Sequence, residues 1–281
     1  MMWALRFLVA MLLVLSTAET SWSEVKLNVG RSASDLNEAG EPARFHVTWP
    51  KDATTTWSFD IAATAAGLVT DRLYLGPTVE YHRHTQIDSP QDAFRLGATS
   101  ILVLGDISRG AAAHVQTLAA YQRHAANETT AHGVLALVAA TPLLNSLAID
   151  RRLGPDEFKV RWRPGFGLEY QGGASTGQAF SSTLRGNAKL HLDLFPADTY
   201  LRRRLQVAFD FEGWLDFAES QDDGSLDRRS IFSSSATVYL DEGRRFGASV
   251  EYVNGENPRD GLEKQAFLAA AFVFRLGDAI P

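Results

Sequence analysis

Two histidines stand two residues apart in the run Tyr81-His82-Arg83-His84, and Glu80 directly precedes that run. In an extended strand, side chains two residues apart point to the same side, so Glu80, His82 and His84 share one face. A histidine beside a carboxylate can act as a general base, and a pair of imidazoles can bind a metal ion. Because no serine stands in a recognisable nucleophile setting, we interpret them first as hydrated polar residues of a strand.

A basic set with the same spacing is formed by Lys159, Arg161 and Arg163, and an acidic set includes Asp210 and Glu212. If these faces enclose an interior, opposed charges across it can orient polar solutes through a transverse field. The same residues can instead pair with one another and fill the interior with ion pairs and hydrogen bonds. Both interpretations stay open, and both require elements with a period of two.

That period recurs along the chain. Leu190, Leu192 and Leu194, for example, alternate with polar residues, which is the pattern of a strand with two different faces. Turn-rich stretches separate such runs. They predict about twelve strands, at 44–50, 56–66, 72–84, 93–104, 111–124, 132–141, 157–170, 186–195, 201–217, 231–240, 245–253 and 265–276.

The ends of the chain predict a simple domain organisation. Residues 1–23 are predicted to be a signal peptide, because Arg6 precedes an apolar run that is too short to span a bilayer as a helix. Residues 24–43 are expected to form an N-terminal arm, an extra strand or a plug. Residues 44–281 are predicted to form one β-barrel domain.

Composition excludes several classes of protein. The 281 residues carry a formal net charge of -6 and include no cysteine, which excludes disulfides and thiolate metal sites. The densest basic run is Arg202-Arg203-Arg204, which is too short for a nucleic-acid interface. No nucleotide-binding glycine pattern, calcium loop or zinc signature is present, so we expect no cofactor and no metal.

The last predicted strand finishes with a distinctive alternation, in which the apolar face is Leu268, Ala270, Phe272, Phe274 and Leu276. Aromatic residues on the apolar parity lie near strand ends elsewhere, namely Trp49, Trp57, Tyr81, Tyr121, Tyr170 and Tyr252. This pattern resembles the C-terminal strand and interface girdles of bacterial outer-membrane β-barrel proteins, although here the chain continues for seven residues beyond Phe274.

The resemblance implies an all-β fold, a closed antiparallel transmembrane barrel of about twelve strands in the bacterial outer membrane. It also implies contact with outer-membrane lipid and lipopolysaccharide, and handling by the barrel-assembly machinery. The alternative fold is a soluble periplasmic β-barrel or sandwich, which would turn the same apolar face inward. Pro77 and Pro164 fall inside predicted strands and require a bulge or a shifted boundary.

Three hypotheses for function follow. The first is a passive channel for small polar or charged solutes, with pore-lining candidates Lys159, Arg161, Arg163, Arg204, Glu80, His82, His84, Asp210 and Glu212. The second is a closed structural or surface-interaction barrel that acts through external loops, chiefly 171–185 and 218–230. The third is an envelope hydrolase that uses His82 or His84.

Overall fold

The computed structural model describes residues 25–31, 43–50, 55–85, 91–106, 111–126, 129–144, 150–152, 158–175, 180–196, 204–219, 227–259 and 262–277. The predicted signal peptide lies outside these described residues. Within the described ranges, no helix is long and apolar enough to cross a membrane.

Twelve long strands dominate the structure, and each of the twelve predicted ranges overlaps one of them. Their bounds are β2 Ala43–Pro50, β3 Thr56–Thr70, β4 Leu73–His84, β5 Gln91–Asp106, β6 Ala111–Ala126, β7 Thr129–Leu144, β9 Phe158–Ser175, β10 Ser181–Pro196, β11 Leu205–Glu219, β12 Arg228–Tyr239, β13 Phe246–Asn257 and β14 Leu262–Phe274. Three short strands accompany them, namely β1 Val25–Gly30, β8 Asp150–Arg152 and β15 Leu276–Gly277.

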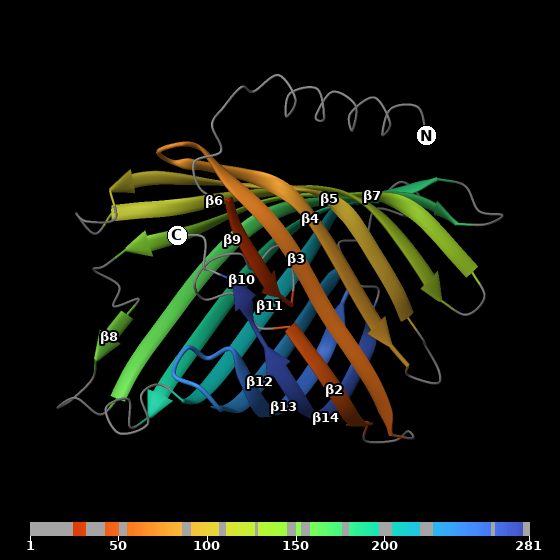
Figure 1. Ribbon diagram of the computed structural model, residues 1–281. Coiled ribbons are helices and arrows are strands. Elements are labelled where there is room, and N and C mark those ends of the chain that lie inside the picture. The colour runs from red at the N-terminus through yellow and green to blue at the C-terminus, as the bar shows by residue number, and fades with distance from the viewer. Residues whose placement is uncertain are drawn as a thin grey trace.

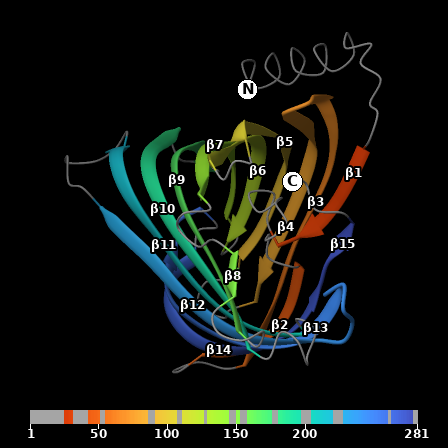
Figure 2. The same cartoon turned by 90° about the vertical axis from the view of Figure 1, so that its left-hand side faces the viewer.

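The long strands close into a barrel (Figures 1 and 2). Successive long strands pair antiparallel with their chain neighbours, and β14 returns to pair with β2, for example Phe272 with Phe45. Since β2 also pairs with β3 and β3 with β4, the sheet of twelve strands has no open side. The predicted fold class is confirmed.

Strands β1 and β2 lie end to end along the same side of β3. Strand β1 pairs with residues 62–67 of β3, and β2 pairs with residues 56–60 of the same strand. On the other side β15 pairs with β1, while β14 pairs with β2. We call the end of the barrel where β1 begins and β15 ends the proximal end, and the opposite end the distal end.

The two faces of the barrel wall differ in polarity. Large apolar side chains point outward, such as Phe166, which is 61% exposed, and Leu168, which is 55% exposed. Charged side chains point inward, such as Glu169, which is 0% exposed. The predicted aromatic residues lie in the distal half of their strands. A soluble barrel turns its apolar side chains inward, whereas this barrel turns them outward, which suits an apolar environment such as lipid.

Much of the predicted loop 171–185 is strand instead, and a glycine-containing stretch near the end of β13 is also strand. Strands β9 and β10 stay paired as far as Gly173 and Ser181, so the connection between them is residues 176–180 and not 171–185. Asn254 and Gly255, which have the sequence of a tight turn, lie inside β13 and pair with both β12 and β14. The paired strands at the distal end therefore continue through glycine-containing stretches that resemble turns in the sequence.

The two strand prolines are accommodated by gaps in pairing. Pro77 pairs with β5, but on its other side the pairing of β4 with β3 is interrupted between Leu75 and Thr78. Pro164 pairs with β10, and residues 162–165 lie between the stretch of β9 that pairs with β7 and the stretch that pairs with β8. Each proline thus faces a strand edge, where a missing amide donor costs little.

Candidate functional site: a charged network across the lumen

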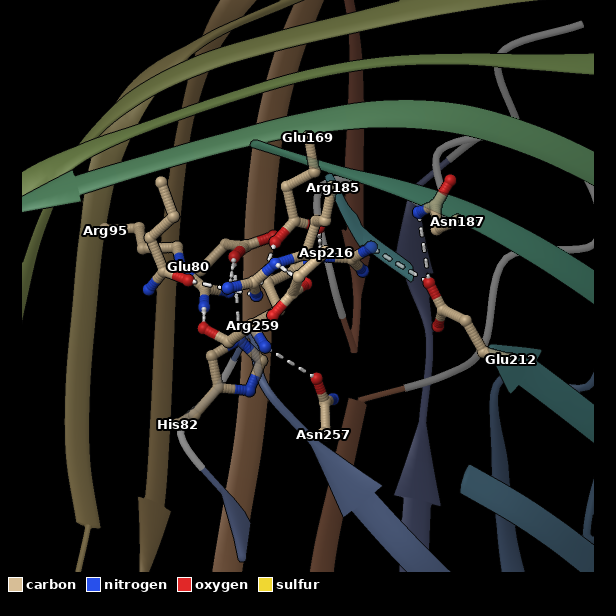
Figure 3. Close-up of polar contacts among 11 residues, drawn as sticks. Glu80, His82, Arg95, Glu169, Arg185, Asn187, Glu212, Asp216, Asn257 and Arg259 are labelled. Atoms are coloured by element: carbon tan, nitrogen blue, oxygen red, sulfur yellow. Dashed lines mark hydrogen bonds and ion pairs between the residues drawn. The ribbon is translucent and has the colours of Figure 1, made fainter. Parts of the chain in front are cut away.

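One arginine from a loop occupies the middle of the lumen (Figure 3). Arg259 belongs to the connection between β13 and β14, and its side chain turns inward instead of toward solvent. Its Nε donates to Glu169 Oε2 on β9 at 2.8 Å, and its Nη2 donates to Glu212 Oε1 on β11 at 2.9 Å. The guanidinium also lies 6.0 Å from the ring centroid of Trp214, an inward-facing residue of β11.

The backbone of Arg259 is held from a third direction. Arg95 Nη2, on β5, donates to the Arg259 carbonyl oxygen at 2.6 Å, while Arg95 Nη1 donates to Glu80 Oε2 on β4 at 2.9 Å. Strands β5 and β11 are five positions apart around a barrel of twelve strands. The contacts of Arg259 therefore cross the lumen and do not run only along its wall.

Further ion pairs extend this arrangement through β10 and β12. Arg185 Nη1 lies 3.3 Å from Glu169 Oε1, and Arg185 Nε lies 3.2 Å from Asp216 Oδ1. Arg229 Nη2 lies 3.6 Å from the other oxygen of Asp216. Asn187 Nδ2 donates to Glu212 Oε1 at 3.3 Å.

The predicted histidine pair lies on the other side of the lumen, between carboxylates. His82 Nδ1 is 2.9 Å from Asp60 Oδ1, and His82 Nε2 is 3.5 Å from Glu80 Oε2. His84 Nε2 is 3.3 Å from Asp60 Oδ1. Among the described residues, no group of three or more histidines and acids has the geometry to hold a metal ion.

From Asp60 the network continues to the closing strands of the barrel. His46 Nε2 on β2 lies 3.4 Å from Asp60 Oδ2, and His46 Nδ1 lies 3.6 Å from Glu251 Oε2 on β13. Arg44 Nη1 donates to Glu251 Oε1 at 2.6 Å. We call the whole set the lumen network: Arg44, His46, Asp60, Glu80, His82, His84, Arg95, Glu169, Arg185, Asn187, Glu212, Asp216, Arg229, Glu251 and Arg259.

Most of this network is excluded from water. Glu80 and Glu251 are 1% exposed and Arg95 is 2% exposed. Removal of one partner from a buried ion pair typically costs about 3–5 kcal/mol, because the remaining charge loses its compensation. The network therefore fixes the side chains around Arg259.

A bulge in β13 directs the chain toward this position. Gly255 has a φ of 131°, and the pairing of β13 with β14 shifts register between Gly255 and Asn257. The amide of Arg259 then donates to Asn257 Oδ1 at 3.1 Å. A bulge bends a strand and re-aims the residues that follow it, which explains how an end-of-strand residue enters the lumen.

We expect Gly255→Ala to displace Arg259. The methyl group would overlap the Ser230 carbonyl, and the backbone conformation is one that alanine rarely adopts. The expected cost is about 1–3 kcal/mol of folding free energy. Thermal unfolding of the refolded barrel measures it, and Gly213→Ala is the control, because a Cβ at Gly213 meets neighbours at 3.6 Å or more. Equal stability of the two variants would contradict a role for the bulge.

The predicted basic set lies nearer the proximal end. Lys159 and Arg161 are buried in the lumen, and Arg163 Nη2 lies 3.9 Å from Asp193 Oδ2 on the adjacent strand β10. Asp210, also predicted, binds His191 on β10. Arg163 and Asp210 therefore pair with residues of the neighbouring strand β10, and not across the bore as we expected.

The structure separates other predicted residues from this set. Glu80 and Glu212, expected to oppose the basic residues, belong to the lumen network and bind Arg95 and Arg259. Arg204 precedes the first residue of β11, where its side chain is 45% exposed and lies 3.8 Å from Glu242. The strand begins one residue too late to place Arg204 on its inner face.

Sequence reasoning missed the residue at the centre of the network. Arg259 lies in a connection, where alternation gives no information on facing. Arg95 does follow a signal, because it stands between Phe94 and Leu96, whereas Arg185 has an apolar neighbour on one side only, Leu184. Trp214 and a small apolar cluster that includes Leu135 and Leu137 also face inward, so the inner face is not uniformly polar.

The class of the protein follows from these observations. A closed antiparallel barrel with an apolar outer face and a charged, ion-paired interior is a transmembrane β-barrel. No protein-family model matches the chain, and no curated protein matches its sequence.

Solved structures with a similar fold include three barrels. The β domain of the Bordetella autotransporter BrkA has a TM-score of 0.48 and 10% identity, covering 89% of this chain and 98% of that chain. An outer membrane channel from Pseudomonas putida F1 has a TM-score of 0.48 and 9% identity, covering 90% and 95%. The NanC porin has a TM-score of 0.45 and 8% identity, covering 83% and 98%. At these values the class of this protein rests on its own geometry.

Proposed function

We propose that the protein is an outer-membrane channel for the passive passage of small polar or charged solutes. The observation that carries the proposal is the inward facing of the charged side chains, including Lys159, Arg161 and Asp193, in a barrel whose outer face is apolar. A lumen lined with both signs of charge can lower the cost of moving a hydrated ion through a membrane.

The outer membrane is the proposed location because the apolar outer face, the predicted signal peptide and the final strand all suit it. The outer surface would then contact lipid and lipopolysaccharide, and the last strand would be recognised by the barrel-assembly machinery. These partners form part of the proposal and follow from the resemblance described above.

Passage in this proposal is limited at Arg259. Because that side chain bridges β9 and β11 while Arg95 holds its carbonyl oxygen, a solute must displace the β13–β14 connection or pass beside it. We therefore expect the unmodified protein to conduct weakly and to open in discrete steps.

A second candidate is a closed barrel with a structural or surface-interaction role. The low exposure of the lumen network favours it, because a permanently open bore would leave such carboxylates hydrated. Surface interaction would then depend on the predicted external loop 218–230, in which residues 220–227 connect β11 to β12. A hydrolase that uses His82 or His84 stays a third hypothesis, since both rings contact carboxylates in the structure.

Single-channel recording of the refolded protein in a planar lipid bilayer tests the channel. Reproducible steps of constant size are expected. Silence from protein that is verified as inserted and folded would support the closed barrel, and shortening of residues 220–227 would then be the next experiment.

Ion selectivity provides a sharper prediction. Arg161→Glu should move the reversal potential in a salt gradient toward that of a cation-selective pore, with a change in permeability ratio on the order of twofold or more, because it reverses a charge inside the lumen. Arg204→Glu makes the same change at an exposed site and should leave the potential close to that of the unmodified protein. Identical potentials for the two variants would remove Arg161 from the pathway.

A further inference from the structure

A second arginine enters the lumen from a turn, at the proximal end. Arg244 lies between β12 and β13 with a φ of 53°, in the left-handed region that non-glycine residues seldom adopt. The side chain of Asp241 holds this turn, since its Oδ1 accepts from the amides of Arg245 at 2.8 Å and Phe246 at 3.2 Å. The turn therefore fixes the position from which the Arg244 side chain extends.

The Arg244 guanidinium lies over aromatic rings. It is 5.2 Å from the centroid of Phe195 and 5.8 Å from that of Tyr239. The guanidinium of Arg161 lies 5.8 Å from the same Phe195 ring. The Phe195 ring is 1% exposed, so the guanidinium groups of Arg161 and Arg244 are two like charges held close together in a region of low polarity.

Several other arginines lie near Arg244 in the part of the chain that the structure describes. The positive charges of Arg161, Arg244 and Arg275 repel that of Arg163. The charges of Arg161 and Arg275 likewise repel that of Arg244. Burial, together with Arg275 and Arg161, lowers the pKa of Arg244, although Tyr239 and Asp193 act in the opposite direction. A direct ion pair would raise the pKa of a base, so the lowered pKa agrees with an Arg244 guanidinium that is buried without a carboxylate partner among the described residues.

The nearby carboxylate is already engaged. Asp193 lies 3.9 Å from Arg163 Nη2, but its Oδ1 is 2.9 Å from His191 Nε2 and also accepts from Gln206. In the part of the chain that the structure describes, no carboxylate lies within ion-pair distance of the Arg244 guanidinium. Arg161 and Arg275 have contacts of their own, so the inference depends on Arg163 and Arg244.

We propose that Arg163 and Arg244 form a binding site for the carboxylate or phosphate group of a small soluble anion, at the proximal end of the lumen. Guanidinium groups suit this ligand class, because their planar donors match the oxygens of carboxylates and phosphates in a bidentate manner. Bound anion would supply the negative charge that Arg244 lacks. The claim that this anion is the substrate of a channel rests on the proposed function. Binding of the anion does not itself require conduction.

Equilibrium titration tests the site directly. Inorganic phosphate and citrate are titrated into the refolded full-length protein in uncharged detergent micelles at low ionic strength, with heat as the readout. Saturable binding with one site per chain is expected. Arg163→Gln combined with Arg244→Gln should weaken it by about tenfold or more, since each lost charged hydrogen bond is worth a large factor in affinity.

One control separates a specific site from general attraction. Arg204→Gln removes an exposed arginine at the same end and should leave affinity within about twofold. Equal weakening by Arg204→Gln would overturn the proposal, as would the absence of saturable binding. Arg244→Lys retains the charge without the planar donors and should lie between the double variant and the unmodified protein, so it tests the site even if the double variant unfolds.

Two further arms identify the source of the anion and separate the two proposals. Phosphatidylglycerol added to the micelles should not compete with phosphate; competition would assign the site to a lipid headgroup and overturn a soluble ligand. A protein that binds phosphate but does not conduct would retain this inference and lose the channel. A protein that conducts but does not bind would retain the channel and lose this inference.

Discussion

Arg259→Ala should increase single-channel conductance and decrease stability at the same time. The substitution removes the bridge between Glu169 and Glu212, so the lumen loses its central side chain, while the buried Glu169 and the partly buried Glu212 each lose a charged partner. We expect a loss of about 3–5 kcal/mol in the free energy of unfolding, the usual result of breaking a buried ion pair. Bilayer recording measures the first effect and thermal unfolding in detergent measures the second.

The two effects are informative because a simple loss of structure would not give both. Arg229→Ala is the matched control, since the Arg229 side chain is 28% exposed and pairs with Asp216 and Asp227 near a strand end. Such an accessible pair is worth about 0–1 kcal/mol, and its loss should leave conductance unchanged. If Arg259→Ala lowers stability without any increase in conductance, Arg259 supports the fold and does not limit passage.

Leu168→Arg should prevent stable insertion into lipid. Leu168 is 55% exposed on the outer face of β9, pairs with Val138 of β7, which is 50% exposed, and lies near the middle of its strand. An arginine that faces lipid near the bilayer midplane costs about 2–4 kcal/mol in a barrel of this kind. Folding efficiency into lipid vesicles, followed by protection from added protease, measures the loss.

Leu168→Ala separates the effect of charge from the loss of apolar area, and it should retain most of the insertion. A soluble barrel would behave differently, because an exposed arginine on its surface would improve solubility without reducing folding. Normal insertion of Leu168→Arg would contradict a lipid-facing position for β9.

The alternation of side chains was sufficient to predict the strands and their facing. Facing is a local property, since neighbouring residues of a strand must point to opposite sides. For this reason Lys159, Arg161 and Glu80 could be placed inside the barrel from the sequence, and Leu168 outside. Arg204 shows the limit of the method, because a difference of one residue in the start of β11 removes it from the inner face.

The partners of these side chains depended on the tertiary structure. Which strands lie next to one another decides that Glu80 binds Arg95, and that Arg163 faces Asp193. Sequence spacing carries no information on contacts between elements that are far apart in the chain.

Arg259 is the clearest example of what only the tertiary structure decided. It lies in a connection without periodicity, and it contacts strands that are 47 and 90 residues away along the chain. Its inward position depends on the bulge at Gly255, which in sequence is indistinguishable from an ordinary turn. Local patterns therefore determined the wall of the barrel, whereas the closure of the sheet determined what fills it, because charges buried in a lumen must find partners across the space that closure creates.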